Sequence, residues 1–139
     1  MSRNLSVRSC HVGGFTLVEA LVALLVLSIG LLGVASMQLK ALQSAHVGYQ
    51  RSIASLAAQD AQEMLWAELA DSGALSCPDK TAVNDSAWGT KWGAYLPGLD
   101  SDPVGTPTNC EFPITISWNE ERFGGGGESF SYTVRLPGE

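Results

Sequence analysis

The sequence predicts an α+β fold in which a long N-terminal helix packs on a small antiparallel sheet. Ala20–Leu39 is a run of twenty residues without a charge, and an apolar stripe with helical spacing continues from it to Asp71. Near the C-terminus, two β-rich segments flank a glycine-rich turn. A chain of 139 residues has room for one small globular domain beyond such a helix.

Residues 15–39 are the first element, and they are long enough to cross a bilayer as a helix, which needs about 20 apolar residues. An ordinary secretory signal is a poorer interpretation, because its apolar core is shorter and a cleavage site follows it. A generic membrane anchor is the stronger alternative. Arg3 and Arg8 precede the segment and favour a cytoplasmic N-terminus by the positive-inside tendency.

Glu19 is an acidic residue at the start of this apolar segment. A carboxylate inside a membrane costs on the order of 3 kcal/mol and usually marks a specific partner. Cleavage between Gly14 and Phe15 would create an α-amino group four residues from Glu19, about one helical turn away. The two opposite charges can neutralise each other, within one chain or between neighbouring chains.

The sequence Gly-Phe-Thr-Leu-Val-Glu at residues 14–19, ahead of an apolar run, resembles the class III signal of type IV prepilins and pseudopilins. In that family a membrane peptidase cuts after the glycine and methylates the new N-terminal phenylalanine. The resemblance implies that residues 1–14 are a leader, that prepilin peptidase cuts between Gly14 and Phe15, and that Phe15 becomes N-methylated. It also implies that Glu19 docks the subunit into a filament, and that the fold is pilin-like.

Residues 20–39 look most like PilV-type minor pilins, in which a Ser-Ile-Gly-x-Leu-Gly segment and a later Met-Gln pair occur at this place. The likeness implies a minor pilin of a type IV pilus, anchored in the inner membrane with a periplasmic C-terminal domain and active in assembly initiation or at the tip. Its partners would be prepilin peptidase, other minor pilins, the major pilin and the inner-membrane assembly platform. A minor pseudopilin of type II secretion and a stand-alone membrane-anchored binding module remain as alternatives.

Residues 40–71 are expected to continue the helix as an amphipathic segment. Apolar residues recur at threes and fours from Leu42 to Leu69, and the segment contains no proline. Gly48 costs about 1 kcal/mol relative to alanine, and Ser72-Gly73 is a stop signal. The stripe is therefore expected to pack against the domain that follows.

Residues 72–139 are predicted to form that small β-containing domain. Residues 74–110 are rich in Gly, Pro, Asp, Asn and Ser, and we expect a long irregular region with a short strand or helix. Residues 112–118 and 128–136 alternate in polarity on either side of a turn at 124–127, which predicts an antiparallel hairpin. Trp88, Trp92 and Trp118 are expected to fill the core.

The sequence contains three cysteines, Cys10, Cys77 and Cys110. The apolar segment separates Cys10 from the others, and the predicted cleavage would remove it. We expect the remaining pair to form a disulfide in an oxidising compartment. Closing this loop is worth about 3–4 kcal/mol in the chain-entropy model.

No pattern of catalytic or metal-binding residues supports an enzyme, a cofactor or a metal site. The run Gly124–Gly127 lacks a following Lys-Ser or Lys-Thr, and His11 and His46 have no further ligands at suitable spacing. Glu120 and Glu121 are expected to mark a solvated strand end. Beyond residue 14, six basic residues face fourteen acidic ones, which disfavours nucleic-acid binding.

Overall fold

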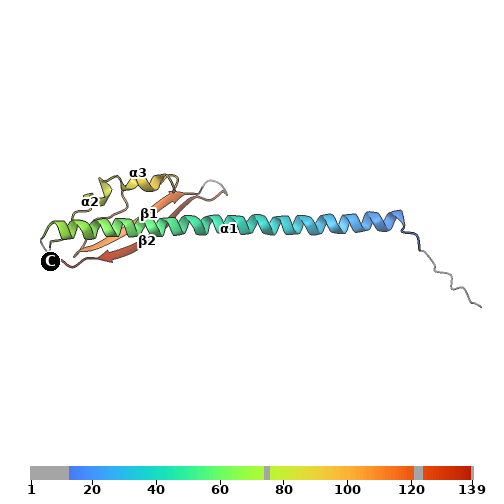
Figure 1. Cartoon of the computed structure of the whole chain (residues 1–139), viewed down its shortest axis with the longest axis horizontal. Coiled ribbons are helices and arrows are strands. Elements are labelled where there is room, and N and C mark those ends of the chain that lie inside the picture. The colour runs from blue at the N-terminus through green and yellow to red at the C-terminus, as the bar shows by residue number, and fades with distance from the viewer. Residues whose placement is uncertain (1–12, 74–75, 121–123, 139) are drawn as a thin grey trace, which may run out of the picture. The chain divides into compact units, whose positions relative to one another are not determined.

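The computed structural model describes residues 13–73, 76–120 and 124–138 (Figure 1). Its elements are the helices α1 (Leu17–Asp71), α2 (Thr81–Asn84) and α3 (Trp88–Gly93) and the strands β1 (Glu111–Asn119) and β2 (Gly127–Arg135). The chain divides into two compact units, one ending at Ala41 and the other beginning at Leu42. The predicted α+β, pilin-like architecture, a long N-terminal helix with a small antiparallel sheet, is confirmed.

Helix α1 begins at Leu17, two residues later than expected, and ends at Asp71. The Ser72 amide still donates to the Glu68 carbonyl oxygen at 3.0 Å, closing the last turn. Gly73 then adopts a φ of 60°, a left-handed conformation that glycine enters without a Cβ penalty. The stop predicted at Ser72-Gly73 is confirmed.

Strands β1 and β2 form the predicted antiparallel hairpin, with each of the nine residues from Glu111 to Asn119 opposite a residue from Arg135 back to Gly127. Side chains alternate between the two faces of a strand, so the even-numbered positions of β1 share one face. These four are fully buried: Phe112, Ile114, Ile116 and Trp118. The hairpin therefore presents one apolar face to the domain core.

The C-terminal part of α1 contacts that core through a stripe of alanines. The fully buried members are Ala54, Ala57, Ala58 and Ala61. Such small side chains let aromatic groups reach the helix backbone itself. The Trp88 indole donates to the Ala57 carbonyl oxygen at 3.0 Å, and the Tyr132 hydroxyl donates to the Ala58 carbonyl oxygen at 2.8 Å.

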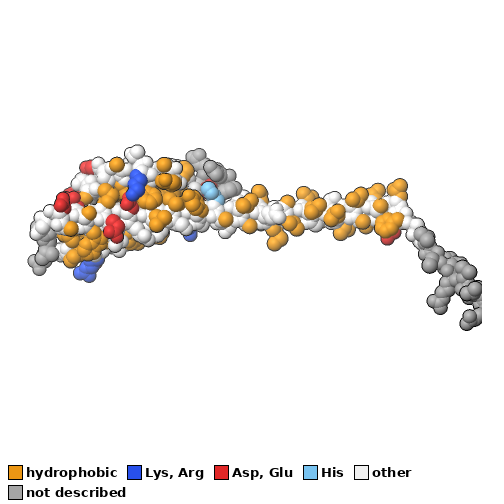
Figure 2. Space-filling view, in the orientation of Figure 1, with side chains coloured by type: hydrophobic (Ala, Val, Ile, Leu, Met, Phe, Trp, Pro, Cys, Tyr) orange, Lys and Arg blue, Asp and Glu red, His pale blue; other side chains and the backbone are white. Residues whose placement is uncertain are grey.

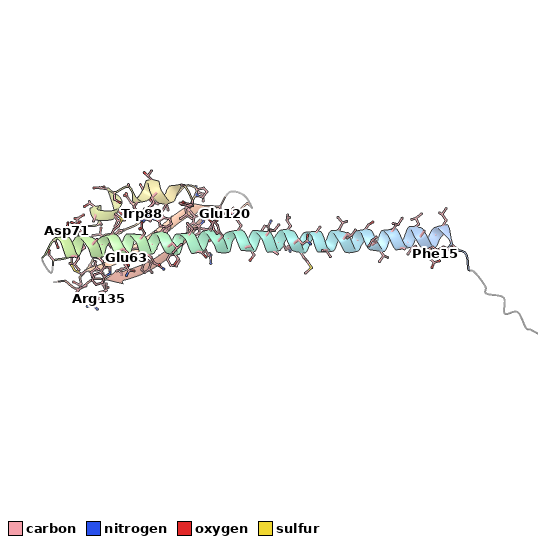
Figure 3. The ribbon with its side chains drawn as sticks, viewed as in Figure 1. Phe15, Glu63, Asp71, Trp88, Glu120 and Arg135 are labelled. Carbon is pink, nitrogen blue, oxygen red and sulfur yellow. A yellow bond between two sulfur atoms is a disulfide. The ribbon has the colours of Figure 1, made fainter. Side chains whose placement is uncertain are left out.

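Two further tryptophans donate to polar side chains of α1. Trp118 Nε1 lies 3.2 Å from Gln50 Oε1, and Trp92 Nε1 lies 2.8 Å from Asp60 Oδ2. Burial raises the pKa of Asp60, but hydrogen bonds from Trp92 and Lys91 outweigh it, so the net pKa lies below the usual value. Trp118 is buried as predicted, and so is Trp88 (Figure 3), whereas Trp92 is only partly buried.

The segment predicted to be irregular carries the short helices α2 and α3. Asn84, at the end of α2, makes two hydrogen bonds from its side-chain amide to the backbone of Val104. Its Nδ2 donates to the Val104 carbonyl oxygen at 2.9 Å, and its Oδ1 accepts from the Val104 amide at 3.1 Å. This pair of bonds ties α2 to the chain that precedes β1.

Residues 97–105 cover the side of β1 that faces away from β2. Four backbone hydrogen bonds of 2.8–3.1 Å join this segment to odd-numbered residues of β1. They are Asn119 N to Pro97 O, Asp100 N to Ser117 O, Thr115 N to Pro103 O, and Gly105 N to Pro113 O. Strand β1 is thus paired along both of its sides.

A tight turn at Asn109-Cys110 leads into β1. Both residues have positive φ, 52° and 57°, and Thr108 and Glu111 exchange backbone hydrogen bonds across them, as in a type I′ turn. A side chain in this region costs about 1 kcal/mol or more, since only glycine and asparagine enter it readily. Cys110 is held there by its disulfide to Cys77, with Cα atoms 5.4 Å apart, so the predicted bridge is confirmed.

The expectation of a solvated strand end at Glu120 is wrong. The Glu120 side chain is only 4% exposed, and its Oε2 lies 3.4 Å from His46 Nε2 on α1. The burial arises because the end of the hairpin packs against a helix turn far away in the sequence, which strand alternation does not reveal. Glu121 lies outside the described residues.

Replacing both Cys77 and Cys110 by serine is expected to lower the free energy of unfolding by about 3–4 kcal/mol, because the unfolded chain regains the entropy of the open loop. Denaturant titration of the oxidised full-length protein and of the double variant in detergent measures this difference. Thiol labelling of the denatured, unreduced protein is the control. Labelling at both Cys77 and Cys110 in the wild-type chain would show that the bridge does not form.

Candidate processing and docking segment

Thr16 is the N-cap of α1, a role that the sequence analysis missed. Its Oγ1 accepts a hydrogen bond from the Glu19 amide at 3.3 Å, and its carbonyl oxygen accepts from the Ala20 amide at 3.2 Å. The spacing from Thr16 to Glu19 is that of a capping box, and this was the signal available in the sequence. Phe15 therefore precedes the helix, whereas we expected it to be the first helical residue.

Glu19 lies in the first turn of α1, and its side chain is exposed. The amide groups of a helix N-terminus favour a negative charge by about 0.3–1 kcal/mol. That gain is smaller than the cost of placing a carboxylate in hydrocarbon, on the order of 3 kcal/mol. The helix end therefore offsets only part of the cost, and a membrane-embedded Glu19 needs a positive partner.

Gly14 is a glycine that the described structure of the chain does not require. It has no positive φ, and a Cβ added to it would meet no described atom within 4 Å. The next residue, Phe15, is 74% exposed, which is unusual for a large aromatic side chain in water. Both features are expected of residues that another protein recognises and that the fold of the chain itself does not require.

The N-terminal part of α1 is apolar on all sides. Its most apolar window has a mean hydropathy of 2.6, and none of that window is buried. Hydrophobic side chains cover the visible face of this segment in Figure 2. The Ser28 hydroxyl donates to the Leu24 carbonyl oxygen at 2.7 Å, so this polar group is satisfied within the helix. By length and composition, α1 is able to cross a membrane.

Other predicted features of this region lie outside the described residues. They are Arg3, Arg8 and Cys10, together with most of the predicted leader. The structure thus brings together Gly14, Phe15 and Glu19 at the beginning of α1, with Thr16 as the residue that fixes where the helix starts.

Residues 10–35 match the family model of the prokaryotic N-terminal methylation motif. No curated protein and no solved structure matches the chain. The matched residues include Gly14, Phe15 and Glu19 and stop before the C-terminal domain. The motif and the long apolar helix fit a type IV pilin-like, membrane-anchored subunit, which is a structural rather than a catalytic role.

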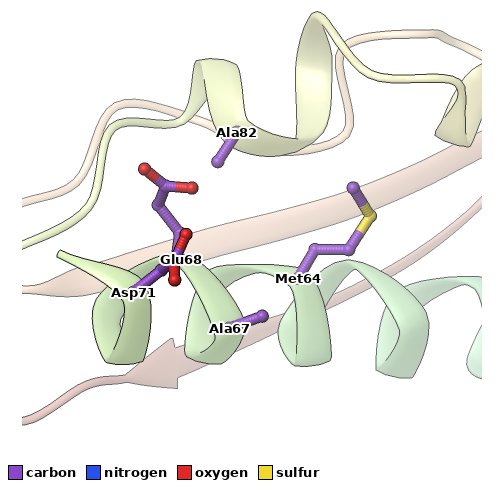
Figure 4. Close-up of a pocket in the computed structure, with 5 residues that line it drawn as sticks. All are labelled: Met64, Ala67, Glu68, Asp71 and Ala82. Atoms are coloured by element: carbon purple, nitrogen blue, oxygen red, sulfur yellow. The ribbon is translucent and has the colours of Figure 1, made fainter.

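The C-terminal domain carries a shallow groove between α1 and α2. It is lined by Met64, Ala67, Glu68, Asp71 and Ala82, with two carboxylates at one end (Figure 4). Within residues 13–73, 76–120 and 124–138, no group of three or more His, Cys, Asp or Glu side chains is placed to hold a metal ion. The residues that line the groove are thus two acids and three apolar side chains.

Replacing Thr16 by alanine is expected to fray the start of α1, because the amide of Glu19 loses its side-chain acceptor at a cost of about 1 kcal/mol. Hydrogen exchange of the full-length protein in micelles should show faster exchange at Glu19, whereas Thr16→Ser should preserve the wild-type rate. An unchanged rate in Thr16→Ala would contradict the capping role.

Proposed function

We propose that this chain is a minor pilin of a type IV pilus. It is made as a precursor, cut by prepilin peptidase between Gly14 and Phe15, methylated on Phe15, and held in the inner membrane before assembly. Glu19 then docks the subunit by neutralising an N-terminal amine, its own or that of a neighbouring subunit. The subunit contributes to initiating the filament or to its tip.

The observation that carries this proposal is the position of Glu19 within the matched motif. A negative charge four residues beyond the proposed cleavage point is costly in hydrocarbon unless a positive charge is created nearby. Cleavage after Gly14 creates that charge. The exposed Phe15 and the unconstrained Gly14 support recognition of this point by a protease.

Charges in the leader and the disulfide support a periplasmic location for the C-terminal part of the chain in the same proposal. Arg3 and Arg8 favour a cytoplasmic leader, so residues 40–139 would face the periplasm. A disulfide between Cys77 and Cys110 suits that oxidising compartment. The partners would be other minor pilins, the major pilin and the inner-membrane assembly platform.

A minor pseudopilin of a type II secretion system is the second candidate. It shares the processing signal and the membrane helix, so the same motif supports it. The likeness of residues 20–39 to PilV-type proteins favours the pilus. Recovery of the mature chain in sheared surface filaments, together with the major subunit, supports the pilus; its absence there would favour the pseudopilus.

Gly14→Val is expected to block maturation, because the branched valine side chain does not fit a protease cleft that accepts glycine. The variant should remain heavier than the wild-type protein by the mass of residues 1–14, as measured by intact-protein mass spectrometry, and should be missing from filaments. Gly13→Val, one residue earlier, is the matched control and should be cut. If wild type and Gly14→Val have the same N-terminus, the processing proposal fails.

A further inference from the structure

Strand β2 has one side without a backbone partner among the described residues. The antiparallel pattern alternates, so the odd-numbered residues of β1, which bond to residues 97–105, do not bond to β2. The backbone N–H and C=O groups of the even-numbered residues of β2 therefore point toward β1. The amides and carbonyl groups that point outward belong to Gly127, Ser129, Ser131, Thr133 and Arg135.

Between Glu128 and Arg135, which carry charges at the two ends of the strand, the outer side of β2 has few of the devices that usually protect a sheet edge among the described residues. The strand pairs with β1 without a bulge, contains no proline or lysine, and carries small polar side chains at Ser129, Ser131 and Thr133. All three of these residues are exposed. Residues 97–105 cover the corresponding side of β1, so only the β2 side of the hairpin lacks a described backbone partner.

A groove of about 310 Å³ runs beside this open edge, between β2 and α1. Its lining residues are Ser55, Gln59 and Gln62 from α1 and Phe130 and Tyr132 from β2. The two aromatic rings are half-buried, with centroids 5.9 Å apart. Alternate side chains of a strand added to β2 would point toward this groove, because strand side chains alternate between the two faces.

The charge around the groove is negative on the side of Tyr132. Burial, and secondarily the negative charge of Glu63, raise the pKa of Tyr132 above its usual value. At the other end, Arg51 and Glu128 neutralise each other in an ion pair of 3.1 Å. Glu63 is exposed, so a basic side chain beside Tyr132 finds a complementary charge.

We propose that the open edge of β2 and the groove beside it bind an extended strand of a partner protein by antiparallel strand addition. The backbone of the added strand pairs with Ser129, Ser131 and Thr133. Its inward side chains are apolar toward Phe130 and carry a lysine or arginine toward Glu63. Such addition supplies affinity through main-chain hydrogen bonds and specificity through alternate side chains.

A second copy of this chain fits the edge less well. In antiparallel pairing of β2 with β2 of another copy, the side chains brought toward the groove would be those of the even-numbered residues, Glu128, Phe130, Tyr132 and Val134. None of these side chains is basic, so a second copy offers no positive partner for Glu63.

The test uses the full-length protein in detergent and a nine-residue synthetic peptide in which threonine and valine alternate. One inward valine is replaced by lysine so that it lies beside Tyr132. We expect binding by titration calorimetry, and slower hydrogen exchange at the amides of Ser129, Ser131 and Thr133. The even-numbered amides of β2, already bonded to β1, should not change. A peptide of the same composition without the alternation should not bind.

Two pairs of variants separate strand addition from a general loss of structure. Ser131→Pro removes an outward amide but no bond to β1, and should weaken peptide binding about tenfold, whereas Ser131→Ala should leave it unchanged. Glu63→Lys should weaken binding, whereas Glu68→Lys, elsewhere on α1, should not. Unchanged exchange of the even-numbered β2 amides shows that Ser131→Pro is folded.

Three results would overturn the proposal: no binding of the alternating peptide, equal binding of the scrambled peptide, or a β2-mediated dimer of the full chain that Ser131→Pro abolishes. These readouts involve neither cleavage nor filaments. A failure of the proposed pilus role therefore leaves the peptide result intact, and the reverse also holds.

Discussion

Glu19 sets the main electrostatic constraint on this chain, because its carboxylate lies at the beginning of a helix that then carries no charge from Ala20 to Leu39. The N-cap at Thr16 fixes where this helix starts and leaves Phe15 outside it. The helix N-terminus offsets only part of the energetic cost of placing this carboxylate in hydrocarbon, because its dipole contributes about 0.3–1 kcal/mol and the cost is larger. In the proposed function, the α-amino group that cleavage after Gly14 would create supplies the remainder.

A second physical requirement shapes the C-terminal domain, which must pack against the same helix with few residues. Alanines on α1 allow Trp88 and Tyr132 to donate directly to backbone carbonyl groups of the helix. Trp118 and Trp92 reach Gln50 and Asp60 on the same helix. Indole and phenol groups thus combine apolar burial with satisfied polar atoms, as a small core demands. The disulfide at Cys110 adds a covalent constraint where the turn before β1 has positive φ.

Much of this fold was predictable because its signals are local and periodic. The helical stripe ending at Ser72-Gly73 and the alternation of residues 112–118 each follow from a repeat visible within one segment. The end of α1 and the hairpin were predicted correctly for that reason. The N-cap at Thr16 had a visible signal in its spacing to Glu19, but the helix was placed from its apolar run alone.

Other features depend on contacts between distant segments, and the sequence offered no local sign of them. Glu120 is buried because the end of the hairpin packs beside His46. Asn84 ties α2 to Val104, and residues 97–105 cover one side of β1, so the region predicted to be irregular is ordered by long-range pairing. The open edge of β2 likewise has no local signal in the sequence, because it follows from the pairing of residues 97–105 with β1.

The most direct test of the central claim is the amount of Glu19→Ala protein in sheared surface filaments, relative to the membrane fraction. If Glu19 neutralises an N-terminal amine during docking, its removal leaves that amine unpaired in hydrocarbon. The variant should then be cleaved and inserted normally, yet its share in filaments should fall at least about a hundredfold. Glu68→Ala, which removes an exposed acid from the other end of α1, should assemble like the wild type. Normal incorporation of Glu19→Ala, with a normal pilus yield, would contradict the account and leave α1 as a plain membrane anchor.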